Sequence, residues 1–426
     1  MIFDEVARLS VDTGQARVYE HGWQSWSPTT TYALDTPSHR PLSDFSGVQH
    51  YRPGSAKPRG RYLGEGLLLV DDGRGKVTCF AAATPEEVPS IMAWAEGDRV
   101  LVASTGPVDT TTAPDMDTAL ADFGRRFAKV SGVRAIRPAP TVWCSWYHYF
   151  TAVTEADIDE NLDAIGESEL PVDVIQIDDG WQRHVGDWLH LSDRFTSLRR
   201  IVSRINASGR RAGIWIAPFL ALPDSDLARE HPEWLLPGRA GHNWDADTRA
   251  VDPIAARPYL RQVFAMLREA GFDYFKLDFL YAGAMRSIAD YRRGLGYIRD
   301  VVGTDSYILG CGAPILPSVG LCDAMRVSPD IAAHYAPPGG DACEPSQFGA
   351  TLNTVSRAWQ HGRFWVNDPD CIVARPAIER REDWASTVER YGGLRASSDR
   401  IKDLDEWGMD TTRRLLSTVP EPVPFS

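Results

Sequence analysis

This 426-residue sequence contains no long hydrophobic run and few lysines. No stretch of about 18 apolar residues is present, so we expect no membrane-spanning helix. The first residues carry neither a basic segment nor an apolar one, and we expect no secretory signal. The six cysteines lie apart, without a Cys-x-x-Cys pair, as is usual for thiols in a reducing compartment. We therefore expect a cytoplasmic protein.

Positively charged residues are fewer than negatively charged ones. The chain has 45 Lys and Arg against 58 Asp and Glu, a formal net charge of −13. Since an acidic protein repels polyanions, we expect neither nucleic acid nor an anionic membrane as a partner. The sequence lacks the HExxH, Cys–His zinc and P-loop motifs, so it predicts no metal site. It does have 14 tryptophans, which suit either a large core or a pocket of flat rings that stack on a sugar.

Short β-type segments separated by turn residues fill the first part of the chain. They include residues 66–70, 77–82 and 99–103, and they predict an antiparallel β domain. Residues 115–131 follow, with Leu120, Phe123, Phe127 and Val130 at helical spacing. We expect a linking helix there.

From residue 138 onward, eight apolar segments alternate with helical stretches. This order is typical of a (β/α)₈ barrel, and a competing doubly wound sheet lacks a GxGxxG motif. We predict an α/β fold: a (β/α)₈ TIM barrel over 138–418, preceded by a smaller antiparallel β-sandwich over 1–137, with a tail at 419–426. The predicted strands are 141–146, 172–177, 211–216, 274–278, 306–309, 324–327, 364–366 and 394–396, and the predicted helices are 154–165, 196–208, 256–270, 284–302, 346–361 and 381–391.

Charged residues gather where these strands end, and the carboxyl ends of barrel strands face the active site. Lys276 and Asp278 stand two residues apart, so both side chains point into the barrel. Asp330 follows the sixth strand. Only one strand, the fifth, separates strands four and six on the barrel rim, so Asp278 and Asp330 can face each other across a sugar ring. Two carboxylates in that arrangement can perform retaining glycoside hydrolysis.

Other strand ends offer binding groups. The adjacent Asp178 and Asp179 can accept hydrogen bonds from neighbouring sugar hydroxyls, and helix N-capping or a turn is the alternative for them. Trp215 stands at the barrel mouth, where we favour a stacking wall over a core position. Lys276 and Arg326 would keep nearby carboxylates ionised. A purely structural ion pair is the alternative for Lys276.

Several of these segments resemble the glycoside hydrolase family 36 α-galactosidases, or melibiases. The matching runs are 143–150 (WCSWYHYF), 176–181 (QIDDGW), 213–219 (GIWIAPF), 275–280 (FKLDFL), 309–312 (LGCG), 325–330 (MRVSPD) and 367–371 (NDPDC). Residues 21–28 (HGWQSWSP) resemble the loop that the family's β domain lends to its active site. The resemblance covers roughly residues 20 to 400.

The resemblance implies a role for each matching residue. Asp278 matches the nucleophile and Asp330 the acid/base. Asp178 and Asp179 match the residues that bind the 4- and 6-hydroxyls of galactose. The other matches are ligands of the ring hydroxyls (Lys276 and Arg326), pocket walls (Trp143, Trp215 and Cys311) and the tryptophan of the β-domain loop (Trp26, or else Trp23).

The resemblance thus implies a retaining, exo-acting α-galactosidase that needs no cofactor and removes terminal α-D-galactosyl residues from oligosaccharides. It leaves self-association open. Two features depart from the family pattern: the β domain of about 137 residues is short, and we expect no C-terminal β domain after the eighth strand.

Other functions stay open. Related barrels act on α-N-acetylgalactosaminides or β-L-arabinopyranosides, or transfer galactose to sucrose. By analogy with the family, Cys311 and Gly312 lie where a 2-substituent would be sensed and favour a free 2-hydroxyl. The pair Asp178 and Asp179 favours a bound 6-hydroxyl. A different class of enzyme would use Lys276 for a Schiff base, as class I aldolases do. A sugar-binding protein without activity would have no need of both Asp278 and Asp330.

Overall fold

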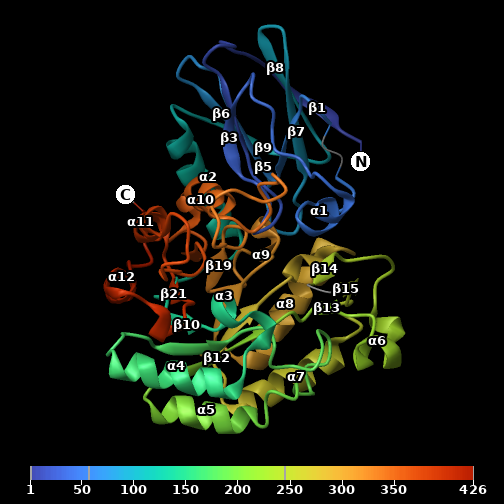
Figure 1. Ribbon diagram of the computed structural model, residues 1–426. Helices are drawn as coiled ribbons and strands as arrows, with labels where there is room; N and C mark the ends of the chain where they lie inside the picture. Colours follow the sequence, from blue (N-terminus) through green and yellow to red (C-terminus); the bar gives the residue numbers. More distant parts are fainter. Residues whose placement is uncertain (1, 56–57, 244–245, 426) are drawn as a thin grey trace.

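The computed structural model of the chain describes residues 2–55, 58–243 and 246–425. Two antiparallel sheets form its N-terminal part, and a parallel eight-stranded sheet forms the rest. Figure 1 shows the antiparallel sheets above the barrel. The predicted fold class, a TIM barrel preceded by a smaller β-sandwich, is confirmed. The boundary between residues 137 and 138 stays a prediction.

The sandwich pairs a four-stranded sheet with a five-stranded one, and its strands alternate their side chains between two cores. In β5, Leu68 and Val70 face the core between the sheets, whereas Leu67 and Leu69 belong to the larger core shared with the barrel. This division follows from the two-residue period of a strand. In the four-stranded sheet the order is β1 (Asp4–Ser10), β8 (Arg99–Ser104), β7 (Ser90–Glu96) and β4 (Tyr62–Glu65). In the five-stranded sheet the order is β3 (Thr30–Ala33), β2 (Arg17–Glu20), β5 (Leu67–Asp71), β6 (Val77–Ala81) and β9 (Asp109–Ala113).

The linking helix α2 (Met116–Val130) is present, and Asp115 caps it by accepting a hydrogen bond from the Thr118 amide. Leu120, Phe123 and Phe127 are buried, whereas Val130 has an exposed fraction of 58 %. Val130 is the last helical residue, and the chain turns away at Gly132, which has a φ of +74°.

The eight parallel strands follow one another around the barrel in chain order, as predicted. The ring closes where Leu394 N donates to Asn367 O (2.9 Å) and Ile372 N donates to Ala396 O (2.6 Å). The seventh strand begins two residues later than predicted. The strands are β10 (Thr141–Cys144), β11 (Val174–Ile177), β12 (Arg211–Ile216), β17 (Tyr274–Leu277), β18 (Tyr307–Gly310), β19 (Ala324–Arg326), β20 (Val366–Asp368) and β21 (Arg395–Ser397).

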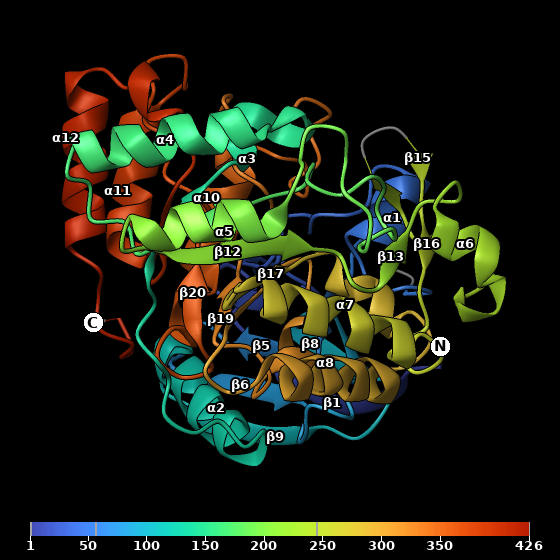
Figure 2. The same cartoon turned by 90° about the horizontal axis from the view of Figure 1, so that it is seen from below.

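Helices cover the outside of the barrel (Figure 2). They are α4 (Glu155–Glu167), α5 (Leu198–Ala207), α7 (Arg257–Ala270), α8 (Ile288–Val302), α9 (Ile315–Ser318), α10 (Gln347–Ser356), α11 (Arg381–Tyr391) and α12 (Glu406–Ser417). Helix α12 was not predicted, and it packs Leu415 and Leu416 into the core behind β21. It therefore provides the last helix of the barrel. No helix in the described ranges is both long and apolar enough to cross a bilayer.

The loops carry shorter elements. They are α1 (Asp44–Gln49), α3 (Trp146–Tyr149), α6 (Asp226–Glu230), the two-residue strands β13 (Leu220–Ala221), β14 (His242–Asn243), β15 (Ala246–Asp247) and β16 (Arg249–Ala250), and 3₁₀ turns at Phe150–Ala152, Pro232–Trp234, Leu280–Ala284, Ala358–Gln360 and Ile401–Asp403. Several of these elements lie at the carboxyl ends of the barrel strands, where they help to form the rim of the site described below.

One buried arginine joins the sandwich to the barrel. Arg357 follows α10, and its Nη1 donates to Ser25 O (2.6 Å) and Val327 O (2.8 Å). Its Nη2 donates to Gln24 O (2.9 Å) and Ser27 O (3.0 Å). The loop also pairs with the barrel directly, since Ser25 N donates to Ala313 O (3.1 Å). These contacts fix residues 24–27 against the barrel.

We expect Arg357→Met to be strongly destabilising. The substitution removes the donor of the Ser25, Ser27 and Val327 carbonyls and one of the two donors of the Gln24 carbonyl, and a buried unsatisfied group costs about 1–3 kcal/mol. Thermal unfolding measures the effect, with Arg413→Met on the exposed face of α12 as the control. A melting temperature equal to that of the control would contradict this role.

Candidate active site

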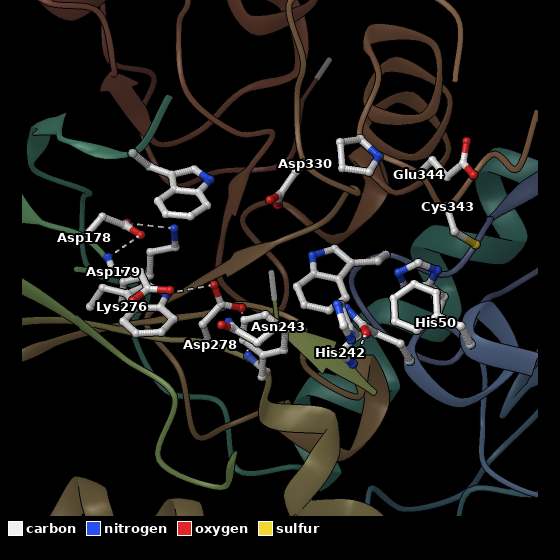
Figure 3. Close-up of a pocket in the computed structure, with 17 residues that line it drawn as sticks. His50, Asp178, Asp179, His242, Asn243, Lys276, Asp278, Asp330, Cys343 and Glu344 are labelled. Atoms are coloured by element: carbon white, nitrogen blue, oxygen red, sulfur yellow. Dashed lines mark hydrogen bonds and ion pairs between the residues drawn. The ribbon is translucent and has the colours of Figure 1, made fainter. Parts of the chain in front are cut away.

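A cavity of about 260 Å³ opens at the carboxyl ends of the barrel strands (Figure 3). Its inner end is charged and aromatic, whereas residues of the surrounding loops form its outer end. The lining residues at the inner end are Trp146, Asp178, Asp179, Trp215, Lys276, Asp278 and Asp330. The others are Trp26, Phe45, Gln49, His50, His242, Asn243, Phe279, Cys343, Glu344 and Pro345.

Asp278 stands directly after β17, and both of its carboxylate oxygens accept a hydrogen bond. Trp215 Nε1 donates to Oδ2 (2.9 Å), and the Phe279 amide donates to Oδ1 (2.7 Å). Phe279 has a φ of +51°, a left-handed conformation that is uncommon outside glycine. Such strain often occurs at functional sites, and here it accompanies a carboxylate fixed in one orientation.

Lys276 forms a buried ion pair with Asp178 on the neighbouring side of the barrel. Its Nζ lies 2.9 Å from Asp178 Oδ2, which also accepts from Gln176 Nε2 at 2.6 Å. Burial lowers the pKa of Lys276, but the negative charge of Asp178, together with smaller contributions from Cys144, Asp278 and Cys311, outweighs it. The pKa of Lys276 is therefore raised well above the usual value. A protonated amine cannot attack a carbonyl, so this contact argues against a Schiff-base role.

Asp179 also turns toward the cavity, as the sequence predicted for both carboxylates. It is 3 % exposed, and its Oδ1 accepts from Gln182 Nε2 at 2.7 Å. Gly180 follows with a φ of +123°, and a Cβ there would lie 2.6 Å from the carbonyl oxygen of Thr151. Only glycine fits this close approach, and the turn it makes leaves Asp178 and Asp179 both facing inward.

Asp330 faces the cavity from the segment after β19. Arg326 Nη1 donates to its Oδ1 at 2.8 Å, and 26 % of the Asp330 side chain is exposed, against 2 % for Arg326. Burial raises the pKa of Asp330, the positive charge of Arg326 opposes this, and the negative charge of Asp278 adds to it. A carboxyl group that keeps its proton to higher pH is suited to act as a general acid.

Three tryptophans line the cavity: Trp26, Trp146 and Trp215. Trp26 comes from the sandwich loop and packs edge-on against Phe279, with ring centroids 5.2 Å apart. Trp23 lies in a separate pocket, where the Arg52 guanidinium sits 4.8 Å above its ring. Of the two candidates in this loop, Trp26 is therefore the one at the site.

The structure corrects two predicted pocket walls. Trp143 is fully buried on the outer side of β10, and its indole donates to Asp399 O at 2.9 Å. Cys144 bears the next side chain of β10 and faces Asp178 at 3.3 Å, so the two-residue period turns Trp143 away from the cavity. Cys311 is also buried and does not line the cavity.

Arg326 likewise lies beneath the cavity rather than in its wall. It reaches the site through its contact with Asp330. The residues that the sequence did not single out come mostly from loops: α1 supplies Phe45 and Gln49, and β14 supplies His242 and Asn243. No periodicity marks such positions. Trp146 lies just after β10, as the first residue of α3.

Residues 2–55, 58–243 and 246–425 contain no group of three or more His, Cys, Asp or Glu side chains that could hold a metal ion. The cationic partners of the buried carboxylates in the cavity are instead side chains of this chain. Lys276 contacts Asp178, and Arg326 contacts Asp330.

Comparisons with known proteins agree with this geometry. The family model described as melibiase matches residues 117–310. The bifunctional α-galactosidase/sucrose kinase AgaSK of Mediterraneibacter gnavus is 27 % identical over 186 residues, 39 % of this chain and 17 % of that protein. α-Galactosidase C of Emericella nidulans is 24 % identical over 302 residues, 62 % of this chain and 38 % of that protein. The matches thus span less than half the length of either relative.

A solved structure covers far more. TtGalA, an α-galactosidase from Thermus thermophilus in complex with p-nitrophenyl α-D-galactopyranoside, aligns with a TM-score of 0.83 and 26 % identity, over 98 % of this chain and 92 % of that one. The combination of a short sandwich and a barrel, which departs from the expected family pattern, therefore has a counterpart in a solved protein.

The barrel, its carboxylates and these matches together define a glycoside hydrolase architecture. Within that class, the chain is similar to the melibiase family over residues 117–310 and to the α-galactosidases named above.

The ion pair at the inner end predicts strong thermodynamic coupling. Lys276→Met or Asp178→Asn alone should lower the free energy of unfolding by about 3–5 kcal/mol, because each leaves a buried charge without its partner. The double variant should lose clearly less than the sum of the two. The exposed pair Arg204 and Asp159 is the control, with an expected coupling below about 1 kcal/mol. Additive losses at Lys276 and Asp178 would contradict the prediction.

Proposed function

We propose that the protein is a retaining, exo-acting α-galactosidase that hydrolyses terminal α-D-galactosyl residues of oligosaccharides. One observation carries the proposal: Asp278 and Asp330 line the same cavity from β17 and β19, which flank β18 in the barrel. The two carboxyl groups differ in environment. Asp278 accepts hydrogen bonds from two N–H groups, whereas burial raises the pKa of Asp330.

In the first step, an oxygen of Asp278 attacks the anomeric carbon while Asp330 donates its proton to the departing glycosidic oxygen. The C–O bond to the leaving group breaks as the bond to Asp278 forms, which gives a covalent glycosyl-enzyme. Trp215 Nε1 and the Phe279 amide hold the Asp278 carboxylate in place for this attack. Arg326 holds Asp330 at 2.8 Å.

In the second step, the same groups act in reverse. Asp330, now a carboxylate, takes a proton from water, and the water oxygen attacks the anomeric carbon. The bond to Asp278 breaks, and the sugar leaves with the configuration it had in the substrate. Asp330 recovers its proton in this step. Two inversions at one carbon therefore give overall retention.

The inner end of the cavity fits a terminal sugar. Asp178 and Asp179 would accept from the 4- and 6-hydroxyls of galactose, while Lys276 would donate to a ring hydroxyl from its place beside Asp178. The ion pair closes this end, so the chain of an oligosaccharide can leave only through the outer end. That closure supports an exo mode of action.

Two features support galactose over the sister sugars. A side chain at Gly312 would lie 2.9 Å from the Trp26 ring, so this corner is already filled, which favours a free 2-hydroxyl over an N-acetyl group. The carboxylates of Asp178 and Asp179 favour a sugar with a 6-hydroxyl over an arabinopyranoside. A cytoplasmic location, self-association and the absence of a cofactor stay predictions.

The outer end would hold the leaving group. Phe45, His50 and His242 surround it, with ring centroids 5.8 Å apart between Phe45 and His50 and 6.0 Å apart between Phe45 and His242. Aromatic faces of this kind suit the C–H surface of a second sugar. Glu344, from the segment before α10, adds a carboxylate to the same end. We propose that these residues bind the sugar next to the terminal galactose.

The proposal is tested by assaying the wild type and Asp278→Ala on p-nitrophenyl α-D-galactoside, beside the β-galactoside, α-glucoside, α-N-acetylgalactosaminide and β-L-arabinopyranoside. We expect turnover of the α-galactoside alone and its loss in Asp278→Ala. Azide should restore release of p-nitrophenol and give β-galactosyl azide, because a small anion can fill the space of the missing carboxylate.

Asp273→Ala is the matched control, since Asp273 stands at the opposite end of β17 and pairs with Arg211. It should keep activity on the α-galactoside. Turnover in a different well would instead assign a sister specificity, and inactivity in every well would contradict the proposed function.

A further inference from the structure

Asp370 has no part in the mechanism above, yet it contacts two groups that hold Asp330 in place. Its Oδ1 accepts from Arg326 Nη2 at 2.7 Å, and Arg326 in turn holds the Asp330 side chain. Its Oδ2 accepts from the amide of Ile331 at 2.8 Å, the residue that follows Asp330. One buried carboxylate thus fixes both the side-chain partner and the backbone of Asp330.

We propose that Asp370 is a positioning residue for proton transfer by Asp330, a role that rests on the proposed function. It holds Arg326 and the 330–331 backbone together, so that the Asp330 carboxyl stays directed at the glycosidic oxygen. Asp370 does not line the cavity, so it acts through Asp330 and does not touch the substrate.

Arg326 is the rigid connector in this arrangement. Its planar guanidinium contacts three carboxylates: Asp330 through Nη1, Asp370 through Nη2, and Asp368 through Nε at 3.2 Å. The contacts with Asp368 and Asp370 fix the plane of the guanidinium, and this sets the direction of the Nη1 donor toward Asp330. An arginine suits this task because its donors have a fixed geometry.

Asp370 is itself held in an uncommon conformation. Its φ is +105°, in the range that usually belongs to glycine, and it is 1 % exposed. The Tyr147 hydroxyl donates to Oδ2, and the Cys371 amide donates to Oδ1 at 2.6 Å. Backbone strain of this kind persists only where the surroundings enforce it, and here the enforced conformation aims the carboxylate at Arg326 and Ile331.

The charges around Asp370 couple it to Asp330. Facing it are Arg326, Asp330, Asp368, Tyr147 and Cys371. Burial raises the pKa of Asp370 to about 7, Arg326 opposes this rise, and Asp330 and Asp368 add to it. Since one guanidinium faces three carboxylates, the loss of the Asp370 charge would also change the protonation of Asp330.

The test compares Asp370→Asn with the wild type on two α-galactosides whose leaving groups differ. Methyl α-D-galactoside needs a proton on its leaving oxygen, whereas 2,4-dinitrophenyl α-D-galactoside does not. We expect kcat/KM for the methyl galactoside to fall by about 10²-fold, as a misplaced general acid would cause, and kcat/KM for the dinitrophenyl galactoside to fall less than about tenfold. Melting temperatures establish that the variants are folded.

Two further variants sharpen the result. Tyr147→Phe removes one donor to Asp370 and should change the ratio of the two kcat/KM values in the same direction, and it decides the matter if Asp370→Asn does not fold. Asp399→Asn is the matched control. Asp399 is equally buried and forms an ion pair with Arg375 at 2.7 Å, but neither this ion pair nor its hydrogen bonds involve Asp330. Its losses should be equal for both substrates.

An equal loss on both galactosides in Asp370→Asn and Tyr147→Phe would overturn the positioning role, while an active wild type would leave the proposed function standing. A wild type inactive on both galactosides would overturn the proposed function and, with it, this inference.

Discussion

The site depends on the balance of charge between two buried cations and the carboxylates that surround them. Lys276 holds Asp178 at one side of the cavity, and Arg326 holds Asp330 and Asp370 at the other. Buried carboxylates without such partners would take up protons or destabilise the fold. The two catalytic carboxyl groups differ in this respect, because Asp278 receives neutral N–H donors instead and stays directed at the cavity.

The sandwich has a second role besides packing on the barrel. Its loop at 24–27 is anchored by Arg357, and this anchoring places Trp26 against Phe279, the residue whose amide donates to Asp278. Helix α1 of the same region supplies Phe45 to the outer end. The N-terminal part and the barrel therefore build one site between them: the barrel supplies the inner end of the cavity, and loops of both parts supply the outer end.

The alternation of apolar segments was enough to predict the barrel, and the strand-end rule was enough to find Asp178, Asp278 and Asp330. Strand periodicity would also have placed Trp143 correctly: its neighbour Cys144 faces Asp178, so the Trp143 side chain points to the opposite face of β10. What the sequence could not show were contacts between distant loops, such as Phe45 with His242, because no local pattern encodes them. The networks beneath the site, through which Asp370 reaches Arg326, depend on the closed ring of strands and emerge only in three dimensions.

The central claim is that Asp278 forms a covalent bond to the sugar. An α-galactosyl fluoride carrying a second fluorine at C5 should react and then release the sugar slowly, so that the intermediate accumulates. Mass spectrometry of the digested protein should locate the added sugar on the peptide that contains Asp278, and the label should be lost on dilution as activity returns. Labelling of another residue, or turnover without any covalent species together with inversion of configuration, would contradict the account.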